Sequence, residues 1–293
     1  MALLSVKIGE EVSLDDLYGL TQKIISHKID LKLQLSLTSS VLELTDKPRL
    51  ASLNLAHAGD RLNTIPSPIL ALHVRPEEFR YSVLYRLGAP IYRSAGPCPA
   101  CRKPSDRYGH HAIVCGSHGE RIARHHHLRD ALFQAAATAN LAPRKEEGAL
   151  LLGTAERPAA VLIPNWSGGR DTALDVTVVS PLTADRIARS ADNPGHTLKA
   201  AFDEKCRLYH RACEREGIVF VPLLIETLGG WHEKAIDQVR KIARAQARNM
   251  GTEEDEAARH LFQRLGILLV KGNAALLVNC VPTFSPPEVD GHM

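Results

Sequence analysis

The spacing of apolar residues changes along the chain between the period of a strand and the period of a helix. In residues 172–179 (TALDVTVV) apolar and polar residues alternate, which predicts a strand with Asp175 on the face opposite its leucine and valines. Two short apolar runs, 149–152 and 159–164, precede it and are expected to be strands. The continuous apolar run 218–226 (IVFVPLLIE) predicts a buried strand after it.

Helical spacing predicts helices at residues 13–25, 76–87, 120–139, 197–216 and 231–249. Pro76 is suited to the first turn of its helix, and Gly88 and Gly217 are suited to helix ends. From residue 120 the order is helix, three strands, helix, strand, helix. This order favours an α/β fold of the mixed (α+β) kind, with one mixed sheet and helices on both of its faces.

Four regions follow from these patterns. Residues 1–95 form a helical N-terminal region, 96–119 a short cysteine-rich region, 120–284 the mixed α/β domain and 285–293 a flexible tail. The proline- and glycine-containing stretch GAPIYRSAGP marks the junction before the cysteines.

Composition restricts the classes of protein. Of 293 residues, 44% are hydrophobic and 24% are charged, as in ordinary globular domains. The apolar runs read from the sequence are too short to cross a bilayer, and acidic residues near the start argue against a secretory signal. We therefore expect an intracellular protein with no membrane partner.

The net charge of +3 is too small to identify a nucleic-acid-binding protein, but the charge is unevenly distributed. Between Arg102 and Arg129 there are six Lys or Arg, two acids and six histidines. A second basic run, 234–248, lies on a predicted helix. Such clusters can neutralise phosphates, although a single basic helix is usually a solvated surface.

Cysteine and histidine residues in the short region have the spacing of a metal site. Cys98 and Cys101 form a CxxC pair, and Cys115 follows two adjacent histidines, His110 and His111. Three thiolates and one imidazole are a ligand set that zinc binds tetrahedrally, with a structural role because no position is left open. Either histidine has a suitable spacing. We favour His110, because it gives the H-x4-C ending of zinc knuckles.

A second group of residues suggests a catalytic metal site. Asp175 lies in mid-strand between apolar residues, where an unpaired carboxylate is costly. Lys205 lies on the inward stripe of the helix 197–216, and Glu146 and Glu147 precede the first apolar run. Carboxylates that hold Mg²⁺ and a lysine near the phosphate are used in phosphodiester hydrolysis. A purely structural Asp–Lys pair is an equal alternative.

In this order, the motifs resemble a known family. The segments EEFRYSVLYRLGAPI, CPAC with GHHAIVC, RIARHHHLRD, KEEGALL, RPAAVLIP, LDVTVV and FVPLLIETLGG together resemble the zinc-knuckle and endonuclease region at the C-terminus of site-specific non-LTR retrotransposon proteins. That region belongs to the restriction-like, or PD-(D/E)xK, nuclease superfamily. The resemblance covers about two-thirds of the chain, from about Leu53 to Lys241.

The resemblance implies roles for individual residues. It implies Glu146 (or Glu147) as the first acid, Asp175 as the second, both ligands of Mg²⁺ or Mn²⁺, and Lys205 as the amine, since Thr177 occupies the usual strand position of the lysine. The family pattern RPAD reads RPAA here, so Ala160 stands where a catalytic, metal-binding aspartate is expected.

The same resemblance implies a DNA-binding face. The residues expected to contact DNA are Arg121, Arg124, His125 and Arg129; for His125 and its neighbouring histidines an exposed polar role is an equal alternative.

Three functions follow as hypotheses. The first is a Mg-dependent, nuclear endonuclease for duplex or branched DNA with a structural zinc, impaired in this copy by Ala160. The second is a non-catalytic DNA-binding module. The third is a zinc-dependent protein-interaction scaffold. The sequence leaves open a homodimer.

Overall fold

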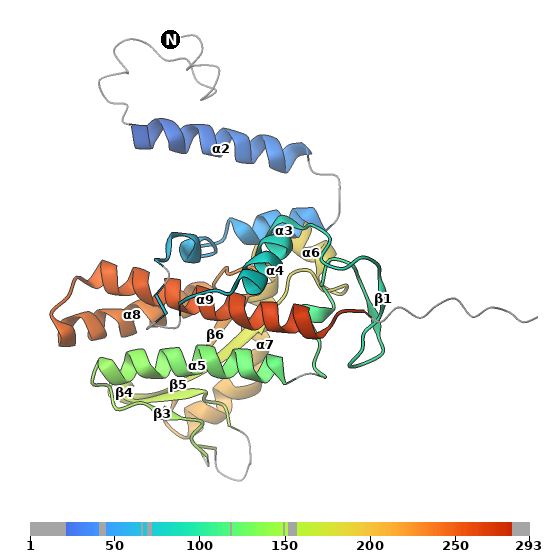
Figure 1. The fold of residues 1–293 in the computed structure, drawn as a ribbon. Coiled ribbons are helices and arrows are strands. Elements are labelled where there is room, and N and C mark those ends of the chain that lie inside the picture. Colours follow the sequence, from blue (N-terminus) through green and yellow to red (C-terminus); the bar gives the residue numbers. More distant parts are fainter. Residues whose placement is uncertain are drawn as a thin grey trace, which may run out of the picture.

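A four-stranded mixed sheet lies at the centre of the structure (Figure 1). The computed structural model describes residues 22–40, 45–65, 67–68, 72–117, 119–148, 150–151 and 157–282. In the sheet, β3 (Arg144–Lys145), β4 (Val161–Ser167) and β5 (Arg170–Val179) are antiparallel neighbours, and β6 (Val219–Glu226) is parallel to β5. The predicted mixed α/β architecture is therefore confirmed.

Helices cover both faces of this sheet. The helices and short 3-10 turns are α2 (Gln22–Ser40), α3 (Asp46–Leu53), η2 (Asp60–Asn63), α4 (Pro76–Leu87), η3 (Ala112–Val114), α5 (Glu120–Thr138), α6 (Ile187–Asp192), α7 (His196–Arg215), α8 (Glu233–Met250) and α9 (Glu254–Asn279). A small hairpin, β1 (Gly96–Pro97) with β2 (Pro104–Ser105), carries the cysteines.

The alternation in β5 explains the two layers. Leu174 and Val176 point into the larger core, with apolar side chains of α5, α8 and α9. Ala173 points into a smaller cluster on the other face, which Cys213 of α7 joins. A strand with both faces covered needs small or apolar residues on each, so Asp175, in the middle of the strand on the α7 face with its side chain 15% exposed, stands out.

Several predicted elements are confirmed within a residue or two, namely α4, α5, α7, β6 and α8. The expected strand at 149–152 is wrong, because the described residues Leu150 and Leu151 are not in a strand and the first strand is the short β3 instead. Leu151 still packs, in the smaller cluster beside β4. The predicted helix at 13–25 lies largely outside the described residues.

Helix α9 was not predicted from the sequence. Within the described part of the chain it is the one helix long and apolar enough to cross a membrane, but 67% of its most apolar window is buried. It packs against α4, α5 and α8, which makes it the central helix of the fold. At Gly272 a Cβ would lie 2.5 Å from the Arg124 side chain, so the close contact of α9 with α5 requires glycine there.

The N-terminal region, the cysteine region and the α/β domain share a buried apolar cluster. One buried cluster joins Tyr85 of α4, Cys98 and Cys115 of the cysteine region, and Leu228 and Leu277 of the α/β domain. The cysteine region is thus held against the body by apolar packing.

Candidate functional site

Four metal-binding side chains meet in the cysteine region. The ligand atoms of Cys98, Cys101, His111 and Cys115 all lie within 4.8 Å of one another. The two sulfurs of Cys98 and Cys115 are 3.8 Å apart, and Cys101 Sγ is 3.2 Å from His111 Nε2. Two thiolates on one tetrahedral zinc, at Zn–S of about 2.3 Å, lie about 3.8 Å apart. The donor set and its spacing therefore fit zinc.

Backbone hydrogen bonds position these ligands. The N–H of Cys98 donates to Lys103 O, and the N–H of Arg102 donates back to Cys98 O, which closes the CxxC loop. Burial alone would raise the pKa of the Cys98 thiol, but backbone N–H groups of Cys101 and Ala100 and a hydrogen bond with His111 lower it to about 6. The loop thus stabilises a thiolate, the form that binds a metal.

The preference for His110 as the fourth ligand is wrong in this structure. The Asp106 carboxylate accepts the backbone N–H groups of Tyr108, His110 and His111 and fixes the turn before η3. In that turn the imidazole of His111 points at Cys101, whereas His110 Nδ1 lies 3.8 Å from Asp106. Residue spacing alone could not distinguish the two, because the direction of each ring depends on the turn.

On the sheet, Asp175 and Lys205 form the expected pair. Lys205 Nζ, from α7, lies 2.9 Å from Asp175 Oδ2, and their side chains are 29% and 15% exposed. Thr177, two residues along β5, donates its hydroxyl to the same carboxylate oxygen at 3.2 Å. An amine and a hydroxyl therefore hold one half-buried carboxylate on the central strand.

Position 160 lies just before β4, and its backbone is hydrogen-bonded on both sides. Ala160 O accepts the N–H of Glu146, and Ala160 N donates to Leu174 O. Ala160 is 5% exposed and belongs to the larger core with Leu174 and Val176, on the face of β5 opposite Asp175. It therefore brings no metal-binding atom to the Asp175–Lys205 pair.

Glu146 is bound to α5. Its carboxylate accepts a hydrogen bond from Arg129 and lies 3.5 Å from His126 Nε2, while its backbone has a positive φ of 46°. The neighbouring candidate, Glu147, lies 3.8 Å from Arg144. The two predicted acids of the magnesium site, Glu146 and Asp175, are thus each paired with a cation on a different helix. In the described part of the chain, the Cys/His group is the one cluster of three or more such ligands.

The four predicted DNA-binding residues differ in their environments. Arg121 is exposed and donates to Val114 O at 3.2 Å. His125 Nδ1 lies 2.9 Å from Val176 O, and burial lowers the pKa of its imidazole. Arg129 is bound to Asp130 and Glu146.

Arg124 contradicts the expectation of a surface contact with DNA. It is 3% exposed, and its guanidinium donates to Asn273 Oδ1 at 2.6 Å and to Ile113 O. Burial, with the nearby charge of Arg121, lowers the pKa of Arg124 to about 10. Its main contacts thus tie α5 to α9, a helix that the sequence analysis had not predicted.

The predicted basic helix is α8, and its cations Lys234, Arg240, Lys241, Arg244 and Arg248 are all exposed. Glu254, at the start of α9, lies 2.9 Å from Arg248 and 3.5 Å from Arg244. This carboxylate offsets part of the positive charge at the C-terminal end of α8.

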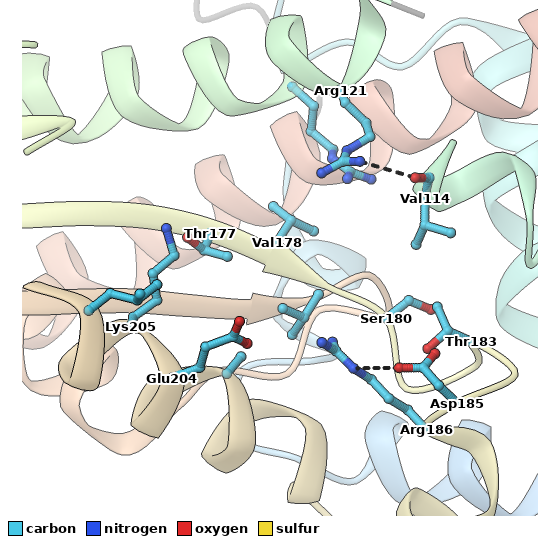
Figure 2. A pocket seen from close by; sticks show the side chains of 14 residues that line it. Val114, Arg121, Thr177, Val178, Ser180, Thr183, Asp185, Arg186, Glu204 and Lys205 are labelled. Carbon is cyan, nitrogen blue, oxygen red and sulfur yellow. Dashed lines mark hydrogen bonds and ion pairs between the residues drawn. The ribbon is translucent and has the colours of Figure 1, made fainter. Parts of the chain in front are cut away.

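A cavity of about 320 Å³ adjoins the Asp175–Lys205 pair. Figure 2 shows Arg121, on α5, and Arg186, at the start of α6, reaching it from opposite sides, with Lys205 and Thr177 beside them. Arg186 and Thr183 were not predicted from the sequence. They could have been found from their place in segment 180–186, directly after the strand that carries Asp175, because ligand-binding side chains often follow the end of a strand.

No family model matches the chain, and no curated protein is significantly similar to it. Function is therefore inferred from the geometry of the two sites.

Proposed function

We propose that this chain is a metal-dependent DNA endonuclease of the restriction-like class, with a structural zinc site, in which Ala160 has removed one acidic ligand and suppresses cleavage. The observation that carries the proposal is the Asp175–Lys205 pair at 2.9 Å on β5, with Ala160 hydrogen-bonded to the backbones of Glu146 and Leu174. A restriction-like core for the whole α/β region belongs to the same proposal.

Each of these residues would have a different role in cleavage. Carboxylates at 146, 160 and 175 would hold Mg²⁺ or Mn²⁺, which neutralises charge on the attacked phosphate when it is bound. Lys205 places an ammonium beside Asp175, where it can orient water or balance developing charge. Duplex or branched DNA is the proposed substrate.

A second function, a non-catalytic DNA-binding module, is favoured by one observation. Arg129 pairs with the carboxylate of Glu146, Lys205 pairs with that of Asp175, and Ala160 offers no ligand, so both predicted acids are bound to cations of the chain itself. In that case the chain binds DNA with the basic residues of α5 and α8 and does not cut it.

Nicking of supercoiled plasmid DNA in Mg²⁺ or Mn²⁺ separates the two. Restoring one bridging carboxylate is worth about 4 kcal/mol, or about a thousandfold in rate. We expect little cleavage by the natural chain, strong metal-dependent nicking by Ala160→Asp, and loss of it in Ala160→Asp with Asp175→Ala.

Ala160→Asn is the matched control, because it has the size of aspartate without its charge. Circular dichroism and DNA binding show whether each variant is folded. Vigorous nicking by the natural chain, or an inactive Ala160→Asp that is folded and bound to DNA, contradicts the endonuclease proposal.

A further inference from the structure

The cavity beside Lys205 is lined by more positive than negative charge. Arg121, Arg124, Arg186 and Lys205 line it, together with two carboxylates, Asp185 and Glu204 (Figure 2). Both carboxylates belong to exposed residues; the Asp185 side chain is 76% exposed and lies 3.6 Å from Arg186. Both acids are exposed, as is Arg121, whereas Arg186 and Lys205 are half-buried and Arg124 is buried. The buried charge on the cavity wall is therefore positive.

Two of these cations have no acidic partner among the residues that the structure describes. The hydrogen bonds of Arg121 and Arg124 go to neutral groups: backbone carbonyls at 114 and 113, and the amide oxygen of Asn273. The two guanidinium groups also repel each other, which contributes to the lowered pKa of Arg124. An anion in the cavity would relieve this repulsion.

Within the described part of the chain, two polar atoms of the wall are buried without a hydrogen-bond partner. They are Nε of Arg124 and the hydroxyl oxygen of Thr183. Leaving such a group unsatisfied costs about 1–3 kcal/mol, so both atoms favour a ligand that accepts hydrogen bonds.

We propose that this cavity binds the phosphate group of a nucleotide. A phosphate accepts several hydrogen bonds and carries the charge that the arginines lack, and arginine binds it well. The volume of about 320 Å³ is at the lower end of small-ligand pockets, so it suits one nucleotide of a strand. The assignment of this nucleotide to a DNA strand rests on the proposed function: the cavity would hold a phosphate next to the one attacked at Asp175.

Calorimetric titration of the full chain with a deoxynucleoside 5′-monophosphate, and separately with inorganic phosphate, tests this proposal. We expect saturable binding of both, tighter for the nucleotide. Arg186→Gln should weaken nucleotide binding by about tenfold, the effect of one charged hydrogen bond. Arg189→Gln, an exposed arginine of the same helix that does not line the cavity, is the matched control and should leave the affinity unchanged.

Thr183→Val gives a second test that is independent of charge. It removes a hydroxyl without a protein partner, so it should keep the stability of the chain yet weaken nucleotide binding several-fold. The proposal is overturned if nothing binds, if the nucleotide binds no tighter than inorganic phosphate, or if Arg186→Gln and Arg189→Gln have equal effects. If Ala160→Asp nicks DNA but the chain binds no nucleotide, only the proposal of a nucleotide-binding cavity is wrong. If the chain binds the nucleotide but Ala160→Asp does not nick DNA, only the proposed endonuclease activity is wrong.

Discussion

The buried carboxyl group of Glu226 should make the stability of the protein depend on pH. Glu226 ends β6, is 1% exposed, and is hydrogen-bonded to the hydroxyl of Ser52 on α3. Burial raises its pKa from 4.5 to about 7, and the Ser52 hydrogen bond offsets part of that rise. The folded protein therefore keeps this proton at pH values where the unfolded chain has lost it.

The sign and size of the effect follow from this difference. Between pH 4.5 and about 7 the folded state holds one more proton than the unfolded state, so the free energy of unfolding decreases as the pH rises. Above pH 7 both states are ionised and the contribution is constant. A shift from 4.5 to about 7 corresponds to about 3 kcal/mol at 1.36 kcal/mol per unit.

Glu226→Gln removes the titrating group while its amide can still bond to Ser52. The variant should match the natural chain at pH 4.5 and be about 3 kcal/mol more stable at pH 8. Urea denaturation at four pH values, with excess zinc, measures this difference. Any loss of zinc in acid affects both proteins equally and cancels in the comparison. Glu216→Gln, at an exposed site, is the control and should show a constant difference. Parallel stability curves for Glu226→Gln and the natural chain would refute the reasoning.

Two further predictions concern zinc and DNA. Removing one of four ligands should cost roughly a quarter of a ~12 kcal/mol binding energy, so His111→Ala should weaken zinc affinity by about a hundredfold, and His110→Ala should leave it intact. Competition with a chromophoric chelator measures this, and the opposite order of the two variants would restore the H-x4-C assignment. DNA affinity should fall steeply with salt between roughly 50 and 200 mM, and Arg121→Gln should reduce the logarithmic slope by about one. Binding that is insensitive to salt in a fluorescence titration would rule out phosphate contacts.

Elements with strong local signals could be predicted from the amino-acid sequence. The alternation around Asp175 predicted β5, and the glycines at 88 and 217 predicted where two helices end, because periodicity and left-handed turns depend on neighbouring residues alone. Composition and spacing also predicted that three cysteines and a histidine would converge, since the ligands lie within one short segment. The pairing of Asp175 with Lys205 followed from the inward stripe of α7.

The direction and surroundings of individual side chains depend on tertiary packing and could not be predicted from the sequence. The turn fixed by Asp106 selected His111 over His110, and the packing of α9 at Gly272 buried Arg124, which local sequence had suggested was a surface cation. Glu146 likewise is bound to Arg129, although its backbone is hydrogen-bonded to Ala160. These outcomes depend on contacts between residues up to 149 positions apart. Sequence periodicity carries no information on such contacts, because burial is set by whichever distant element packs against a given face.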